Sequence, residues 1–323
     1  MDDRPFLVAD VGGTNTRVGL ARGRDVDPRS VRRYANREFA NLGPVLRRYR
    51  DETGGPSPKG ACIAMAGPVA DGVAHLTNLD WSIDITALIE ATDAGSGAIL
   101  NDLQAQGHAL GHLASGSVRT VCDGPRREAA PRLVIGVGTG FNAVSVYDAP
   151  SGRIVPASEA GHANLPIRTE AELRLCTHLS TAHGFAAVED VLSGRGLERV
   201  YHWLALEAGA SDERRAADIM ADLDTDPRAR AALRLFVSML GRVAGNLALI
   251  HLPFGGIVLV GGVARAVSGH LREMGFIDSF RDKGRFAGFM TNFAIDVVED
   301  DFAALTGCAA HLTDIAAQTD GSE

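Results

Sequence analysis

The sequence LVADVGGTNTRVGL at residues 7–20 decides the fold, because it joins a buried strand, a glycine turn and a returning strand. Its apolar first half leads into Asp10 and the pair Gly12-Gly13, and hydrophobic alternation resumes at Arg17. Apolar runs separated by a short glycine turn are typical of an antiparallel β-hairpin. We therefore predict a hairpin with a carboxylate and exposed backbone N–H groups at its turn.

A second stretch, LVIGVGTGFNAVSV at residues 133–146, aligns with the first without gaps. The two share leucine, valine, valine and glycine at matched positions. Two unrelated hairpins would give a similar pattern. We favour an internal duplication, because the glycine turn takes the same position in both copies.

The rest of the chain alternates predicted strands with predicted helices, which indicates an α/β fold. At about 150 residues per domain, the 323 residues predict two domains. Further strands are expected at 61–66, 98–100, 256–260 and 295–298, and helices at 41–51, 83–91, 102–112, 170–182, 188–192, 196–208, 216–223, 227–251 and 303–317.

The composition excludes several classes of protein. Hydrophobic residues make up 46% and charged residues 22%, which is ordinary for a globular chain and excludes disorder as the main state. A net charge of −8 argues against nucleic acid or an anionic membrane as a partner. Four widely spaced cysteines and an acidic N-terminus with no signal core favour reduced thiols and a cytoplasmic enzyme over a disulfide framework or a zinc site.

The octet from Asp10 to Arg17 carries the strongest chemical signal. A glycine turn exposes N–H groups that cradle phosphate oxygens, and a nearby carboxylate can hold Mg²⁺ through water. A simple hairpin turn would explain one glycine but not the whole motif. We therefore name Asp10 as a candidate for water-mediated Mg²⁺ binding, and as nucleotide-binding candidates Asp10, Gly12, Gly13, Thr14 and Asn15.

Two further glycine turns are weaker signals. Gly138-Thr139-Gly140 would form a second phosphate clamp, and paired with the first turn it could grip one polyphosphate. Gly261-Gly262 would pack closely against a nucleoside, although a tight turn from strand to helix explains it equally well.

Several polar residues are candidates for the reacting substrate. Asp102, next to Asn101, is expected at the carboxyl end of a strand, where ligands bind in open α/β sheets and where it could accept a proton from an attacking hydroxyl. A helix cap is the alternative. Glu159, His162 and Glu189 suit hydrogen bonds to sugar hydroxyls, or are simply surface and loop residues.

Taken in order, these motifs resemble those of the bacterial glucokinases, in the zinc-free glucokinase group of the sugar kinase, actin and heat-shock ATPase superfamily. The cysteine-rich zinc motif of the related repressor-type sugar kinases is missing. The resemblance covers essentially the whole chain and rests on DVGGTNTR (10–17), TNLDW (77–81), LNDLQAQ (100–106), GVGTGF (136–141), EAGHANLP (159–166), EDVLSGRGL (189–197), GRVAGNLAL (241–249), GGIVLVGGV (255–263) and DKGRF (282–286). Val137, Ala160 and Asn164-Leu165 depart from the usual pattern in the loops.

The resemblance implies two actin-like (ribonuclease H-like) α/β domains flanking a ligand cleft. Residues 1–112 and 302–323 would form a small domain with the first phosphate segment, and residues 113–301 a large domain with the second phosphate and adenosine segments. It also implies Asp102 as the catalytic residue, Gly138, Thr139, Gly140, Gly261 and Gly262 as nucleotide contacts, and as sugar contacts Asn78, Asn101, Asp102, Glu159, His162 and Glu189.

The activity implied by the resemblance is phosphorylation of glucose at the 6-hydroxyl by ATP and Mg²⁺ in a homodimer. A kinase for another hexose or an N-acetyl sugar is one alternative, and comparing turnover across hexoses would separate the two. A non-catalytic sugar sensor is the other, and it would bind glucose without releasing ADP.

Overall fold

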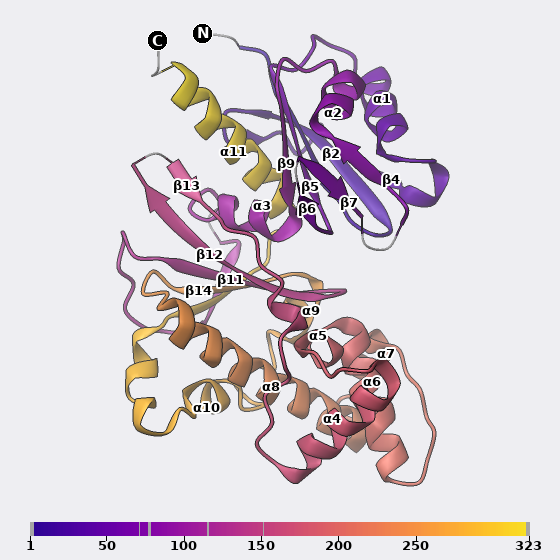
Figure 1. Ribbon diagram of the computed structural model, residues 1–323, viewed down its shortest axis with the longest axis vertical. Helices are drawn as coiled ribbons and strands as arrows, with labels where there is room; N and C mark the ends of the chain where they lie inside the picture. Colours follow the sequence, from indigo (N-terminus) through magenta and orange to yellow (C-terminus); the bar gives the residue numbers. More distant parts are fainter. Residues whose placement is uncertain (1–2, 71, 77–78, 115, 151, 321–323) are drawn as a thin grey trace. The chain divides into compact units, whose positions relative to one another are not determined.

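The computed structural model describes residues 3–70, 72–76, 79–114, 116–150 and 152–320. The chain groups into two compact units (Figure 1), the first made of Met1–Ser115, Asp148–Ala157 and Asp300–Glu323 and the second of Gly116–Tyr147 and Ser158–Glu299. Both units contain strands and helices, and the expected α/β class is confirmed.

Residues 148–157 belong to the first unit, whereas the sequence assigned them to the large domain of 113–301. The side chain of Arg153 donates to the carbonyl of His108 at 2.8 Å, and Gln104 Nε2 donates to the carbonyl of Val155 at 2.8 Å. These bonds tie the segment to helix α3 (Asp102–Ala109), which explains the grouping.

The main sheet of the first unit has the order β3-β2-β1-β5-β9, with β4 paired to β2. Strands β1 and β2 form the predicted antiparallel hairpin, and β1, β5 and β9 are parallel. The strands are β1 (Phe6–Val11), β2 (Asn15–Arg22), β3 (Asp25–Val26), β4 (Arg32–Ala35), β5 (Gly60–Met65) and β9 (Gly97–Asn101), and a small separate sheet holds β6 (Val69–Ala70), β7 (Val73–His75) and β8 (Ser82–Asp84).

Helices cover both faces of this sheet, because successive side chains of a strand point to opposite sides. Leu7 of β1 packs in one core with Leu46 of α1, and Val8 packs in the other core with Leu305 of α11. With both faces buried, the carboxyl edge of the parallel strands is where a ligand can reach the sheet. The helices are η1 (Asn36–Glu38), α1 (Leu42–Thr53), α2 (Ile85–Thr92), α3 and α11 (Ala303–Asp320).

The second sheet repeats this arrangement in the order β10-β15-β14-β11-β12-β13, with β11 and β12 antiparallel and β11, β14 and β15 parallel. The strands are β10 (Val118–Cys122), β11 (Arg132–Val137), β12 (Phe141–Ala149), β13 (Gly152–Ile154), β14 (Ile257–Val260) and β15 (Ile295–Val298). The helices are η2 (Ala160–His162), α4 (Glu170–His183), α5 (Val188–Val191), α6 (Gly194–Glu207), α7 (Ala216–Ala221), α8 (Pro227–His251), α9 (Gly262–Val267), α10 (Phe276–Arg281), η3 (Gly284–Phe286) and η4 (Phe289–Asn292).

The run β2-β1-β5-β9 matches β12-β11-β14-β15 in strand direction, which supports the expected duplication. The gapless alignment, however, is wrong beyond the turn. Val11 pairs with Thr16, whereas the equivalent Val137 pairs with Phe141, so the second turn is one residue shorter. The structural counterpart of Val18 is therefore Ala143 and not the aligned Val144: Val18 and Ala143 lie opposite Ala9 and Ile135.

Helix α8 forms the centre of the second unit. Asp226 caps its first turn and Pro227 is its first residue, an arrangement that favours helix initiation. Among the described residues it is the one helix long and apolar enough to span a membrane, but 56% of that apolar window is buried. Its contacts with α6 and α10 identify it as a core helix.

Helix packing in the first unit buries a histidine pair that should make stability depend on pH. The rings of His108 on α3 and His311 on α11 lie 4.5 Å apart, and His108 Nδ1 has no hydrogen-bond partner among the described residues. Burial, together with the positive charges of His311 and Arg153, lowers the pKa of His108 to about 3.

The unfolded chain takes up a proton at this histidine near pH 6.5, whereas the folded chain does not. Stability should therefore be complete above that pH and fall as the pH drops, by about 2 kcal/mol at pH 5 from this residue alone. Urea unfolding of the wild type and of His108→Leu between pH 5 and 8 measures the effect. The variant should show a shallower decline, and equal slopes would contradict the assignment.

Candidate functional site

The first glycine turn is held in shape by a buried asparagine that the sequence analysis missed. The N–H of Gly12 donates to the carbonyl of Asn15 at 3.0 Å, which closes the turn. Asn36, which is 1% exposed, donates through Nδ2 to the carbonyl of Gly12 at 2.7 Å and through its backbone N–H to the carbonyl of Thr14 at 2.9 Å. Its Oδ1 accepts from the hydroxyl of Thr16 at 2.9 Å.

Asp10 lies at the end of β1, with the Arg17 guanidinium 3.4 Å away across the hairpin. Burial raises the pKa of the Asp10 carboxyl, and the nearby positive charge of Arg17 opposes that rise. No group of three or more metal-ligating side chains occurs among the described residues. Asp10 alone could hold a divalent ion only through water or together with ligand phosphates.

Strand register brings Asn101 and Asp102 to the same sheet edge as the first turn. Val11 pairs with Met65 in parallel, and Met65 pairs with Asn101. Neighbouring strands lie about 4.8 Å apart, so two strand spacings separate the ends of β1 and β9. This edge therefore combines the N–H groups of a glycine turn with a carboxylate.

Asn101, and not Asp102, caps helix α3. Its Oδ1 accepts from the N–H of Leu103 at 3.0 Å, and Gln104 completes a capping box by accepting from the N–H of Asn101. Asn101 Nδ2 also donates to the carbonyl of Gly67 at 2.8 Å, which fixes the loop after β5. Asp102 is the first helical residue, where a negative charge suits the helix N-terminus. The cap position therefore belongs to Asn101, and Asp102 Oδ1 also accepts from the N–H of Leu103, at 2.8 Å.

In the second unit, the glycine turn Gly138–Gly140, predicted as the second phosphate turn, lies beside the start of α6 and the turn after β14. The N–H of Gly138 donates to the carbonyl of Gly140 at 2.9 Å, and the N–H of Gly194 donates to the carbonyl of Gly138 at 2.9 Å. Gly261 lies so close that an added Cβ would be 2.5 Å from the carbonyl oxygen of Val137. The first N–H of α6 is thus bonded to the turn, and the N–H of Gly196 is capped by the hydroxyl of Ser193 at 2.9 Å.

Three of the predicted sugar contacts lie beside this turn. Glu189 on α5 accepts from the N–H of Phe141 at 2.8 Å, and its carboxylate packs against Gly140. Glu159 is the cap residue of η2 and His162 is its last residue, and Gly161 between them packs against the carbonyl of Phe141. The predicted contact Asn78 lies outside the described residues.

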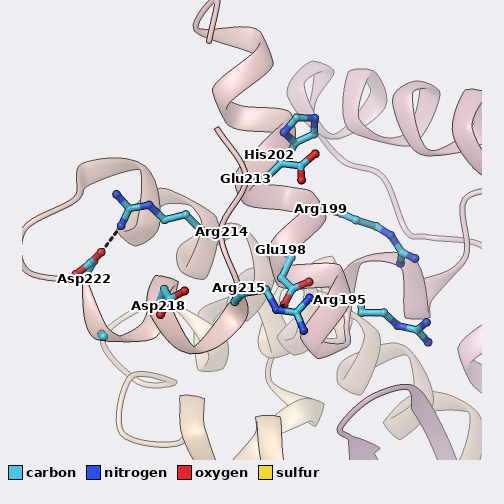
Figure 2. Close-up of a pocket in the computed structure, with 10 residues that line it drawn as sticks. Arg195, Glu198, Arg199, His202, Glu213, Arg214, Arg215, Asp218 and Asp222 are labelled. Atoms are coloured by element: carbon cyan, nitrogen blue, oxygen red, sulfur yellow. Dashed lines mark hydrogen bonds and ion pairs between the residues drawn. The ribbon is translucent and has the colours of Figure 1, made fainter. Parts of the chain in front are cut away.

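A pocket of about 720 Å³ elsewhere in the second unit contains none of the predicted site residues (Figure 2). Four arginines and four acidic residues line it, and two ion pairs lie among them, Arg214 with Asp222 and Arg215 with Glu198 at 3.7 Å. This balance gives no excess charge to attract an ion. The lining residues are Arg195, Glu198, Arg199, His202, Glu213, Arg214, Arg215, Asp218, Ala221 and Asp222.

Comparisons with known proteins agree across nearly the whole chain. A family model described as Glucokinase matches residues 7–315. The glucokinase of Saccharophagus degradans is 31% identical over 95% of this chain and 98% of its own length. The crystal structure of a glucokinase from an Antarctic psychrotroph is 30% identical, with a TM-score of 0.83 over 97% of this chain and 99% of that one.

A more distant structure shares the fold alone. The ROK family glucokinase from Streptomyces griseus, solved in complex with glucose and AMPPNP, is 19% identical, with a TM-score of 0.65 over 95% of this chain and 98% of that one.

The close approach at Gly261 yields a prediction with a matched control. Gly261 has φ of 103°, and alanine there would be strained and would collide with Val137. Gly261→Ala should lower the free energy of unfolding by about 1–3 kcal/mol. Gly262→Ala, where an added Cβ meets no described atom within 4 Å, should be neutral or slightly stabilising. Thermal unfolding of both variants measures the difference. Equal losses of stability would show that the close approach of Gly261 to Val137 is unimportant.

Proposed function

This chain belongs to the glucokinase family, and on that premise we propose that it phosphorylates glucose at the 6-hydroxyl with ATP, giving glucose 6-phosphate and ADP. The observation that carries the proposal is the strand register that brings the first glycine turn and Asp102 to one sheet edge. Phosphoryl transfer needs groups that hold the phosphates and a base for the attacking hydroxyl.

Asp102 is proposed as the general base. Its carboxylate takes the proton of the 6-hydroxyl as that oxygen attacks the γ-phosphorus, and the bond from the γ-phosphorus to the bridging oxygen of ADP breaks. Base catalysis of this kind contributes roughly 10²–10⁴-fold. The N–H of Leu103 orients this carboxylate by donating to Asp102 Oδ1 at 2.8 Å. The second N–H and the second lone pair of the Asn101 amide suit a sugar hydroxyl.

Glu159, His162 and Glu189 are proposed to bind the remaining sugar hydroxyls. A site that hydrogen-bonds a hydroxyl can reject a sugar lacking it by roughly 10⁴-fold. The carboxylate of Glu189 is already fixed by the N–H of Phe141. The Glu189 side chain therefore loses less conformational entropy when the sugar binds than a mobile side chain would.

The nucleotide is proposed to bind through backbone N–H groups. The candidate donors are the N–H groups of Gly13, Thr14 and Asn15 in the first turn and of Thr139 and Gly140 in the second. The N–H groups of Gly12 and Gly138 close these turns, and the Gly261-Gly262 segment is proposed to lie against the nucleotide. Mg²⁺ would arrive with ATP and offset the charge of the phosphates, and Asp10 suits contact with it through water. Binding of AMPPNP, an ATP analogue, by the Streptomyces griseus enzyme supports ATP as the donor.

We further propose that the enzyme acts in the cytoplasm as a homodimer. Buried or partly buried free cysteines and the net charge of −8 suit a reducing compartment without a nucleic-acid partner. Sedimentation velocity would measure the mass in solution, and a monomer at micromolar concentration would contradict the dimer.

The base assignment is tested by Asp102→Asn. The substitution removes the proton acceptor but keeps the size of the side chain, so kcat should fall roughly 10²–10⁴-fold. ADP release from Mg-ATP is measured with a panel of hexoses. Asp84→Asn is the matched control, because Asp84 is an exposed cap of α2 and asparagine caps equally well.

Near-normal turnover of a folded Asp102→Asn enzyme would contradict the assignment of Asp102 as the general base. Release with a different hexose would keep the mechanism and change the substrate. Glucose binding without ADP release from any hexose would identify a sensor.

A further inference from the structure

The side chain of Asn142 is bonded into the loop that carries two of the proposed sugar contacts. Asn142 is the second residue of β12 and lies two positions after Gly140. Its Oδ1 accepts from the N–H of Ala160 at 2.9 Å and from the N–H of Ala143 at 2.8 Å. Its Nδ2 donates to the carbonyl of Ser158.

Among the described residues, the start of this loop has one other side-chain anchor to β12, the hydroxyl of Ser158, which donates to the carbonyl of Ala143 at 2.7 Å. Glu159 is the cap residue of η2 but makes no side-chain capping bond, and its backbone lies outside the helical and extended regions. The far end of the loop is held separately, by the N–H of Val188 donating to the carbonyl of Ala163 at 3.0 Å. Asn142 therefore holds the start of the loop by hydrogen bonds, as α5 holds its end.

Phe141 and Asn142 together hold both groups of sugar contacts. The N–H of Phe141 binds the carboxylate of Glu189, and the side chain of Asn142 binds the backbone on either side of Glu159. The two residues are consecutive and begin β12 immediately after Gly140. A displacement of the phosphate turn would therefore reach both groups through a single short segment.

We propose that Asn142 is a positioning residue, which sets the Glu159–His162 loop for sugar binding and links it to the second phosphate turn. The inference rests on the proposed function, because it assigns the loop to the sugar. Asn142 acts through backbone groups, so it differs from the contacts that touch the substrate. Removing its amide leaves the N–H of Ala160 without its acceptor and frees the start of the loop.

The test is glucose binding by calorimetry together with the KM values for glucose and for ATP. Asn142→Ala should raise the Kd and KM for glucose about 10-fold or more, with the KM for ATP changed less than about 2-fold. Ser158→Ala removes the hydroxyl that ties the same end of the loop to the carbonyl of Ala143, and it should raise the same constants about 3-fold. Because both residues hold one end of one loop, the double variant should lose less glucose affinity than the sum of the two single losses.

Asn292→Ala is the matched control. Asn292 is partly buried like Asn142, and its Nδ2 donates to the carbonyl of Phe289 at 2.8 Å in the same unit. Asn292→Ala removes a comparable hydrogen bond, and it should leave the Kd for glucose and the KM values for glucose and ATP unchanged. A purely structural role for Asn142 predicts instead that the KM values for glucose and ATP rise together.

The outcomes separate this inference from the proposed function. A wild type that binds glucose but releases no ADP contradicts the kinase activity, while the Kd of Asn142→Ala still tests the loop. A wild type that binds no hexose overturns both. An unchanged glucose Kd in folded Asn142→Ala and Ser158→Ala overturns the inference alone. A selective loss that Ser158→Ala shares supports it.

Discussion

Both units depend on one constraint: the first strand of each hairpin, β1 or β11, pairs in parallel with a strand outside the hairpin. Because β1, β5 and β9 run in the same direction, their carboxyl ends meet at one edge, and each ends in a turn or a helix start. The pairing of β11 with β14 does the same for Gly138 and Gly261. Helices bury the faces of the first sheet, so its polar turns gather at its edge. Strand direction therefore determines which turns lie together at the site, whatever side chains those turns carry.

Glycine and asparagine have complementary roles at these sheet edges. Glycine lets backbones approach: Gly161 packs against the carbonyl of Phe141, and Gly261 against that of Val137. Asparagine fixes the backbone that such freedom would leave loose, since one amide can donate and accept at once. Asn36 does this for the first turn and Asn101 for the loop after β5. The turns can therefore present N–H groups in a fixed geometry at the cost of few ordered side chains.

The sequence predicted the hairpins, the long helices and the order of the motifs, because periodicity and glycine turns are local signals. It missed β10, whose first three residues are exposed, and the short helices α9 and α10. It also missed Asn36 and Asn142, whose partners lie up to 24 and 18 residues away and leave no periodic trace. Glu159, His162 and Glu189 are assigned to the sugar through the family motif, since spacing alone could not separate them from surface residues, and this assignment stays a prediction. The grouping of residues 148–157 depends on bonds to α3 that only the folded chain reveals.

The unequal turns of the two hairpins show which part of the copies was free to diverge. Directly opposed residues of an antiparallel pair lie on the same face of the sheet, so the cross-strand pairs, and not the length of the turn, determine which side chains reach each core. Val18 lies opposite Ala9 and Ala143 lies opposite Ile135, although the two turns differ by one residue. A residue could therefore be gained or lost inside the turn without moving an apolar side chain from one core to the other. The turns are the places where the length of the chain can change while the sheet behind them keeps its register.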